Sequence, residues 1–202
     1  MTRTMLGAQI LHLALSSSAA ARIWVVATNG SDANVGTTAA PFRTIQHAVD
    51  LARAGDTVSV RGGTYHPGRL LLRHSGIKRA PITLRNFLGE RPRLDCDASF
   101  SPPRYHRVEL QSIDGWRKAI VWIVIEGLEI TGGWDGIKLY NAHDVVIRNC
   151  SIHDCLSQGI LGSGTRITID SNVIHSVGVN PMGLREEEHD NKLHGIYGTG
   201  GR

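Results

Sequence analysis

Hydrophobic and polar positions repeat about every 22 residues in the second half of the chain. The first series consists of three segments that align without gaps: residues 124–131, 146–153 and 168–175. The second series carries a Gly-Ile pair in each copy, and an insertion widens its last step: residues 135–139, 158–162 and 194–198. A fixed period of roughly 20 to 25 residues is typical of a solenoid, in which each repeat forms one coil and buries its apolar side against its neighbours.

The residue types in the repeats indicate strands rather than helices. β-Branched residues alternate with others and are flanked by Asn, Gly and Ser, which is typical of short strands joined by tight turns. Leucine-rich repeats have a similar period, but their regularly spaced leucines and their helical half are missing. We therefore predict an all-β parallel β-helix, in which residues one period apart lie about 4.8 Å from each other. Two interior stacks are expected: Ile125, Ile147 and Ile169, and Ile130, Ile152 and Ile174.

The pattern is helical in one segment near the N-terminus. Between Pro41 and Ala54 the apolar residues fall on one face of a helix, and Gly55 supplies the stop. Because the first coil would otherwise leave its apolar end in water, we expect this helix to be an N-terminal cap. The first coil strands are expected at residues 58–60 and 82–84.

Length and composition fit one ordinary domain, since the chain has 202 residues and 41% of them are hydrophobic. We predict three segments: a secretory signal peptide over residues 1–21, an N-terminal strand and capping helix over 22–57, and parallel coils over 58–202. The signal peptide is indicated by an apolar run over residues 5–15 and small residues up to Ala21. Gln9 and His12 interrupt that run, so the alternative is a misassigned start or a disordered tail. The run is too short to span a bilayer, and no membrane span is predicted elsewhere.

Two insertions and the end of the chain depart from the repeat. Residues 95–118 and 178–192 are expected to be long loops or irregular coils, and such insertions in a regular scaffold often carry binding and catalysis. The sequence stops at Arg202, directly after a predicted strand and without a polar cap. We therefore expect a C-terminally truncated fragment of a longer β-helix, which should self-associate through its open end.

Charge and cysteine content narrow the partners only slightly. The formal net charge is +4 with dispersed basic residues, which fits an anionic partner but does not indicate nucleic acid. The three cysteines, Cys96, Cys150 and Cys155, follow no metal-site spacing, so no metal site is predicted from them. Cys150 aligns with Leu128 and is expected to be buried, while a disulfide with Cys155 remains open.

Several short motifs carry a resemblance to a known group of proteins. They are Trp24–Ala27, Asn29–Asp32, Pro41–Ile45, Gly55–Val58, Gly63–Tyr65, Pro81–Leu84, Gly89–Pro92 and Glu126–Leu128. Together they resemble the N-terminal half of secreted right-handed parallel β-helix proteins of the pectate-lyase-like superfamily, which includes polysaccharide lyases and alginate-type epimerases. The resemblance implies right-handed coils, a secreted or periplasmic location and an acidic polysaccharide as partner. It does not specify the substrate, because one fold hosts many functions.

Chemically useful side chains are expected on the outer face of the strand that carries the Gly-Ile pair. Alternation sends Lys138 and Tyr197 outward, and His194 lies one position before its glycine. In the resembled lyases this face borders the substrate groove, where β-elimination requires a base, an acid and a cation that neutralises the uronate carboxylate. We therefore predict His194, Tyr197 and Lys138 as catalytic residues. The predicted substrate-binding residues are Asp135, Tyr140, Gln158, Arg185, Lys192, His153 and His175.

The spacing of the acidic residues bears on the cofactor and on the class of reaction. Calcium-dependent pectate lyases of the resembled superfamily place several aspartates in the groove, whereas Asp135, Asp154 and Asp190 are well separated here. Calcium therefore remains an open candidate without an aspartate cluster to support it. A glycosidase needs facing carboxylates on adjacent coils, but the coil neighbours of Asp135 are Gln158 and His194. We expect a lyase that cleaves uronate-containing polysaccharide by β-elimination; the alternative is a non-catalytic carbohydrate-binding or surface-structural β-helix protein.

Overall fold

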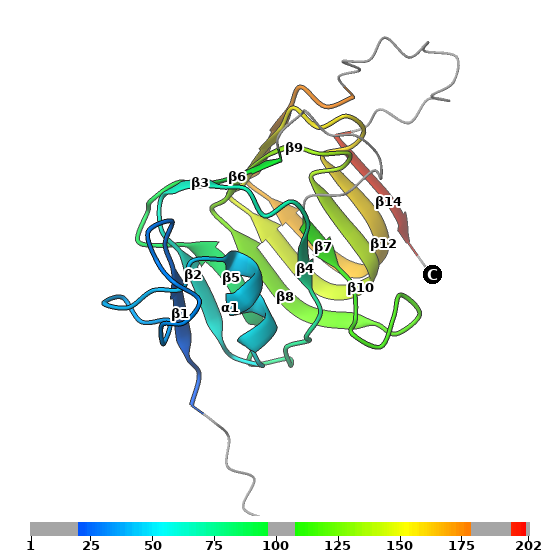
Figure 1. The fold of residues 1–202 in the computed structure, drawn as a ribbon. Coiled ribbons are helices and arrows are strands. Elements are labelled where there is room, and N and C mark those ends of the chain that lie inside the picture. The colour runs from blue at the N-terminus through cyan, green and yellow to red at the C-terminus, as the bar shows by residue number, and fades with distance from the viewer. Residues whose placement is uncertain (1–19, 97–107, 179–194, 201–202) are drawn as a thin grey trace, which may run out of the picture.

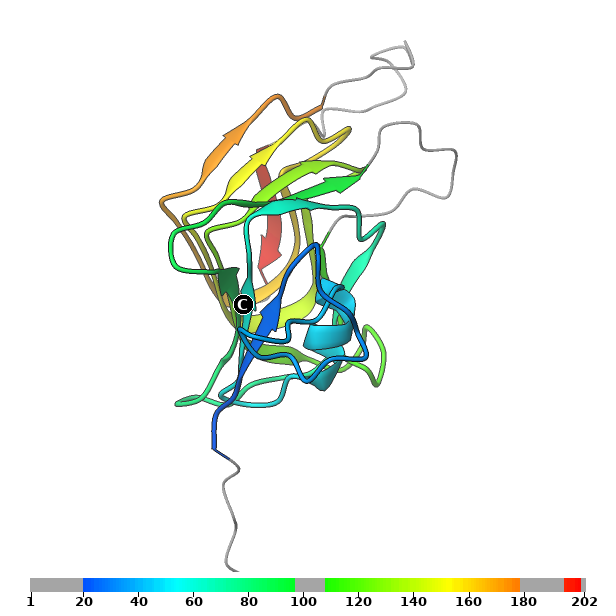
Figure 2. The ribbon, with the colours of Figure 1, turned by 60° about the vertical axis from the view of Figure 1, so that its left-hand side comes forward.

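The computed structural model describes residues 20–96, 108–178 and 195–200, which wind into stacked coils (Figure 1). The strands form one 9-stranded and one 5-stranded sheet, and all pairings between named strands are parallel. The larger sheet bends along its two longest strands, so each full coil has three sides, which we call the base, rear and front faces. Figure 2 shows the coils stacked one behind the other from the N-terminal to the C-terminal strands.

The base face holds the longest run of paired strands. It is built from β1 (Ile23–Val26), β2 (Thr57–Val60), β5 (Ile82–Asn86), β8 (Ile120–Glu126) and the C-terminal parts of β10 (Ile137–Arg148) and β12 (Ile160–Asp170). The predicted coil strands at residues 58–60 and 82–84 are confirmed, because they fall within β2 and β5. The sheet starts earlier than expected, since β1 already pairs with β2 from Ile23 onward.

The rear face is the 5-stranded sheet. It consists of β3 (Gly63–Tyr65), β6 (Pro92–Cys96), β9 (Glu129–Gly132), β11 (Ser151–His153) and β13 (Val173–His175). Ile130, Ile152 and Ile174 are register partners on it, which confirms the second predicted stack. Ile125, Ile147 and Ile169 on the base face confirm the first stack in the same way.

The front face contains two strands that the sequence pattern did not predict. Its members are β4 (Leu70–Leu72), β7 (Val108–Leu110), the N-terminal parts of β10 and β12, and β14 (Ile196–Gly200). The expectation of a long loop or an irregular coil over residues 95–118 is therefore wrong for residues 95–96, which end β6, and for residues 108–110. Residues 108–110 are strand because they pair with β4 on one side and with β10 on the other. The register shifts between Leu139 and Ala142, where β10 turns from the front face onto the base face.

Interior side chains are buried through most of the stack. Ile125, Ile130, Ile147 and Ile152 are fully buried, and burial of each contributes roughly 1.5 to 3 kcal/mol. Ile196 is the register partner of the buried Ile160, but it is 49% exposed, because within the described residues β14 pairs only with β12.

One helix is present in the described part of the chain. α1 (Ile45–Leu51) is shorter than the predicted segment and begins after Thr44, whose hydroxyl accepts a hydrogen bond from the His47 N–H. The Asp32 carboxylate supports this start by accepting hydrogen bonds from the Thr44 N–H and hydroxyl. Ile45, Ala48 and Val49 of the helix join the common core, as an amphipathic helix requires, while Leu51 is 40% exposed.

Cys150 and Cys155 are both buried, and no disulfide joins these two residues. The side chain of Cys96 lies outside the described residues. None of the helices described is long and apolar enough to cross a membrane.

Candidate functional site

Lys138 occupies the centre of the outer surface of the front face. It lies on β10 with Glu109 of β7 as register partner on one side and Leu161 of β12 on the other. The side chain is half-buried, and this burial lowers the pKa of Lys138 below its ordinary value of 10.5, although the negative charges of Asp135 and Glu109 oppose the shift. Its ammonium nitrogen lies 5.4 Å from the ring centre of Tyr140. A lysine in these surroundings loses its proton more easily than one in water, as a general base requires.

A buried ion pair adjoins Lys138 on β7. Glu109 is only 1% exposed, and its two carboxylate oxygens accept hydrogen bonds from Nε and Nη2 of Arg69 at 2.7 and 2.6 Å. This bidentate geometry is the strong form of the arginine-carboxylate interaction. Neither residue was among the predicted site residues, because Glu109 lies in the segment expected to be a loop and Arg69 precedes a strand of only three residues.

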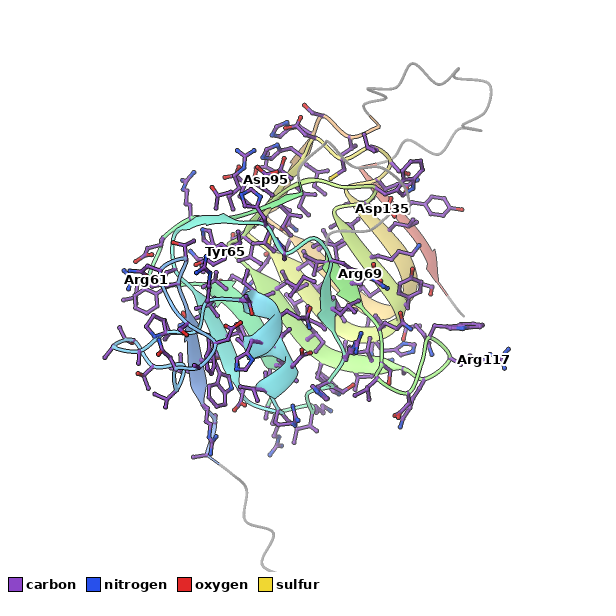
Figure 3. The ribbon with its side chains drawn as sticks, viewed as in Figure 1. Arg61, Tyr65, Arg69, Asp95, Arg117 and Asp135 are labelled. Carbon is purple, nitrogen blue, oxygen red and sulfur yellow. The ribbon has the colours of Figure 1, made fainter. Side chains whose placement is uncertain are left out.

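Asp135 and Gln158 lie at the edge of the front face, but their side chains are not exposed on it. Both are buried, and the main-chain N–H of Gln158 donates to Asp135 Oδ1 at 3.1 Å. The Ser157 hydroxyl donates to Gln158 Oε1 at 2.6 Å, and the Ser157 N–H donates to the Trp134 carbonyl on the preceding coil. Asp135 was expected to be exposed toward substrate, and the stacked turns bury it instead. Its charge reaches the site electrostatically, because it helps to hold up the pKa of Lys138. Figure 3 shows Asp135 and Arg69 on the side of the front face that is turned to the viewer.

Two tyrosines extend the same surface. Burial raises the pKa of Tyr140, and the charge of Glu109 adds to the shift while Arg69 opposes it, so the phenol keeps its proton and can donate a hydrogen bond. Tyr197 is 44% exposed and lies opposite Leu161 on β14. Lys138, Leu161 and Tyr197 therefore lie in one row across three strands, with two strand spacings, about 10 Å, between its ends.

The two predicted histidines with described positions lie on a different side of the coil. His153 and His175 are register partners on the rear face, and their rings stack at 4.9 Å with an interplanar angle of 3°. The two ring nitrogens of His153 contact Asp154 at 2.7 Å and Glu129 at 3.3 Å. This ladder is separated from the front face by the turn over residues 154–159. The remaining predicted residues, His194, Arg185 and Lys192, lie outside the described residues.

Metal ligation has no ready-made centre in the described ranges. No group of three His, Cys, Asp or Glu side chains converges there in a way that could hold a metal ion. Calcium takes about six to eight oxygen ligands, which can come from main-chain carbonyls and side-chain amides as well as from carboxylates.

Comparisons with known proteins relate this fold to right-handed β-helix proteins. Residues 24–180 match the family model described as "Pel9A-like, right handed beta helix region". Uncharacterized protein YwoF from Bacillus subtilis (strain 168) is 52% identical over 65 residues, which is 32% of this chain and 14% of that protein. Pectate lyase PEL9 from Emericella nidulans is 47% identical over 66 residues, which is 32% of this chain and 16% of that protein.

Two solved structures share the fold at low sequence identity. Pectate lyase Pel9A has a TM-score of 0.63 and 20% identity, covering 77% of this chain and 40% of that one. Alginate lyase from Paenibacillus sp. str. FPU-7 has a TM-score of 0.59 and 19% identity, covering 88% of this chain and 58% of that one. The chain thus spans less than two thirds of each of these relatives. The family model nevertheless covers most of the chain, and the protein belongs to the Pel9A-like family of right-handed β-helix proteins.

Proposed function

We propose that this protein is a secreted polysaccharide lyase that cleaves uronate-containing chains by β-elimination, with Lys138 as the base. The observation that carries the proposal is the half-buried Lys138, with its lowered pKa, on the outer face of a β-helix beside the Arg69–Glu109 pair. The related proteins include a pectate lyase in sequence and lyases in structure, which supports the same class of substrate.

Each role in the reaction is assigned to a side chain of the front face or next to it. The neutral Lys138 amine removes the proton next to the uronate carboxylate, and the electron pair forms a double bond in the ring as the glycosidic oxygen leaves. A cation is needed where charge develops on the carboxylate, and Arg69 is held beside Lys138 by Glu109 for this task. The leaving oxygen takes a proton, for which Tyr197 and His194 are the candidates. Tyr140 keeps its proton and donates a hydrogen bond to the sugar.

The same proposal extends to the ends of the chain. Residues 1–21 direct secretion, and α1 closes the N-terminal end of the coil stack, where its apolar residues join the core. Residues 22–57 then form the N-terminal unit and residues 58–202 the coils that carry the site.

The direct test measures new absorbance from unsaturated uronates with pectate, alginate and glycosaminoglycans as substrates. Lys138→Ala should lower kcat by ~10²-fold or more, because a positioned base contributes that much. Lys78→Ala is the matched control, since Lys78 is an exposed lysine in the turn before β5 and should leave kcat unchanged. Equal kcat for Lys138→Ala and the unmodified protein would overturn the assignment of the base.

A non-catalytic carbohydrate-binding role is the second candidate. It is favoured by exposed aromatic side chains, because Trp116 is 61% and Tyr197 is 44% exposed and both offer flat apolar faces to sugars. Tight binding of a uronate polymer without any unsaturated product would support this role over the lyase.

A further inference from the structure

A cavity of about 350 Å³ opens on the outer surface of the front face, beside the row that contains Lys138. Its walls come from β4, from the residue after β7 and from the loop that follows, and the lining residues used below are Arg69, Leu71, Arg73, Gln111, Ile113 and Gly115. Leu71 pairs with Glu109, which pairs in turn with Lys138. The wall at Leu71 is therefore two strand spacings, about 10 Å, from the proposed base.

Hydrogen bonds hold the β4 wall on both edges. Gln46 of α1 accepts a hydrogen bond from the Leu71 N–H at 2.8 Å and donates one to the Leu71 carbonyl at 3.1 Å. The opposite edge of β4 pairs with β7, and the pairing continues where the Gln111 N–H donates to the Leu72 carbonyl. Binding sites for small molecules are usually formed before the ligand arrives, and this strand meets that condition.

The loop on the other side of the cavity is equally well anchored. The Ile113 N–H donates to the Arg73 carbonyl at 3.1 Å, and the Gly115 N–H donates to the Ser112 carbonyl at 2.9 Å. Asn141 Nδ2 on β10 donates to the Arg117 carbonyl at 3.0 Å, which ties the end of the loop to the strand of Lys138.

Positive charge dominates the side chains that line this cavity. Arg69 is held in place by its bidentate pair with Glu109 and is the cation proposed for the carboxylate of the cleaved unit. Arg73 is exposed, and across residues 20–96, 108–178 and 195–200 no carboxylate forms an ion pair with its guanidinium. Gln111 adds an amide that can donate to an oxygen atom. A planar guanidinium beside an amide donor suits a carboxylate better than a neutral sugar.

We propose that this cavity binds the carboxylate of a second uronate unit, with Arg73 as the residue that selects acidic over neutral sugars. The inference rests on the proposed function, because it assumes a polymer whose cleaved unit lies at Lys138. Each sugar unit of an extended polymer is about as long as one strand spacing. A polymer that runs along the coil axis would therefore place the sugar unit two positions from the cleaved unit near Leu71.

The test measures binding of tetragalacturonate and of its fully methyl-esterified form by calorimetry at low salt. All proteins carry Lys138→Ala in addition, so that cleavage does not consume the probe. With Arg73 present we expect the free acid to bind about tenfold more tightly than the ester, and this preference should shrink as salt is raised. Arg73→Gln should remove most of the preference while leaving the affinity for the ester unchanged. Arg79→Gln, at an exposed arginine in the turn before β5, is the control and should keep the preference.

The outcomes separate this inference from the lyase proposal. If Arg73→Gln keeps the preference for the acid, the cavity is not a carboxylate site, whatever the unmodified protein does in the cleavage assay. If the preference disappears with Arg73→Gln but the unmodified protein cleaves nothing, the inference stands and the lyase proposal falls. If neither tetragalacturonate nor its ester binds when Arg73 is intact, the inference is overturned, and cleavage of another polymer would leave the lyase proposal standing.

Discussion

Replacing Glu109 by glutamine tests the electrostatic design of the front face. Glu109 is buried and holds Arg69 through two short charge-assisted hydrogen bonds. Glutamine has nearly the same volume, retains one oxygen acceptor and removes the negative charge. The substitution therefore changes the ion pair while leaving the packing against β4 and β10 almost intact.

The expected loss of stability follows from the unequal exposure of the two partners. Breaking a fully buried ion pair costs about 3 to 5 kcal/mol, whereas surface pairs contribute about 0 to 1 kcal/mol. The Arg69 side chain is 38% exposed and can turn toward water, and the glutamine oxygen keeps one hydrogen bond. We therefore expect Glu109→Gln to lower the free energy of unfolding by about 1 to 3 kcal/mol. Urea denaturation measures it, with Glu126→Gln as the control, because the Glu126–Arg148 pair on the base face is more exposed.

The same substitution should shift the pH dependence of catalysis. The charge of Glu109 raises the pKa of Lys138 against the lowering effect of burial. Without that charge the pKa of Lys138 falls further, so the rising limb of kcat/KM against pH should move to lower pH. An unchanged pH profile together with unchanged stability, equal to that of Glu126→Gln, would refute both the buried pair and its coupling to Lys138.

Three further outcomes are expected from residues in the core and at the site. Ile147→Ala should lower the free energy of unfolding by about 2 to 5 kcal/mol in urea denaturation, while Leu88→Ala at an 82% exposed position should change it by less than about 0.5 kcal/mol; equal effects would contradict the interior stack. In the unmodified protein, kcat/KM should rise with pH to a midpoint below the ordinary lysine pKa of 10.5, because burial lowers the pKa of Lys138 and only the neutral amine is a base; a flat profile from neutral to alkaline pH would exclude it. Cys150 and Cys155 should react with a thiol reagent only after unfolding, because both are buried and burial raises the pKa of the Cys150 thiol; fast labelling of the folded protein would contradict this.

The coils could be predicted from the sequence because one period corresponds to one coil. A spacing of 22 residues between Ile125 and Ile147 translates directly into a register pair, and the same holds for His153 and His175. Each step of the series is local, since the turn between coils keeps a constant length. Long-range contacts in this region of the fold therefore follow from simple counting along the sequence.

The Arg69–Glu109 pair could not be predicted in this way. The two residues are 40 residues apart, which is not a multiple of the period, and Glu109 lies inside the 95–118 insertion. Glu109 lies on a strand of only three residues and Arg69 directly precedes another, and such strands are too short for alternation to be recognised. The burial of Asp135 was not predicted for a different reason: its row in the stack follows from spacing, but its burial depends on how the turns close around it.

The base and rear faces also carry charged ladders, but theirs are internally balanced. On the base face Glu126 pairs with Arg148 at 3.0 Å, one coil away. On the rear face Glu129 pairs with Arg93 at 3.2 Å. A cavity of about 660 Å³ lies where these two faces meet and is lined by both glutamates. Its size alone would favour it as a site, but its glutamates are already paired, so a charged ligand would have to displace an existing partner.

The front face differs because the neighbour of its central lysine is already engaged elsewhere. The register places Glu109 beside Lys138, yet both carboxylate oxygens of Glu109 accept hydrogen bonds from Arg69. The neighbour on the other side, Leu161, has no charge to offer. The half-buried Lys138 ammonium has as neighbours a carboxylate that is already hydrogen-bonded to Arg69 and an uncharged leucine. Such a group favours binding of an anion, and it also loses its proton more easily than a lysine in water. Both responses are those that elimination next to a carboxylate requires, and this is why the front face is a better candidate than the larger cavity.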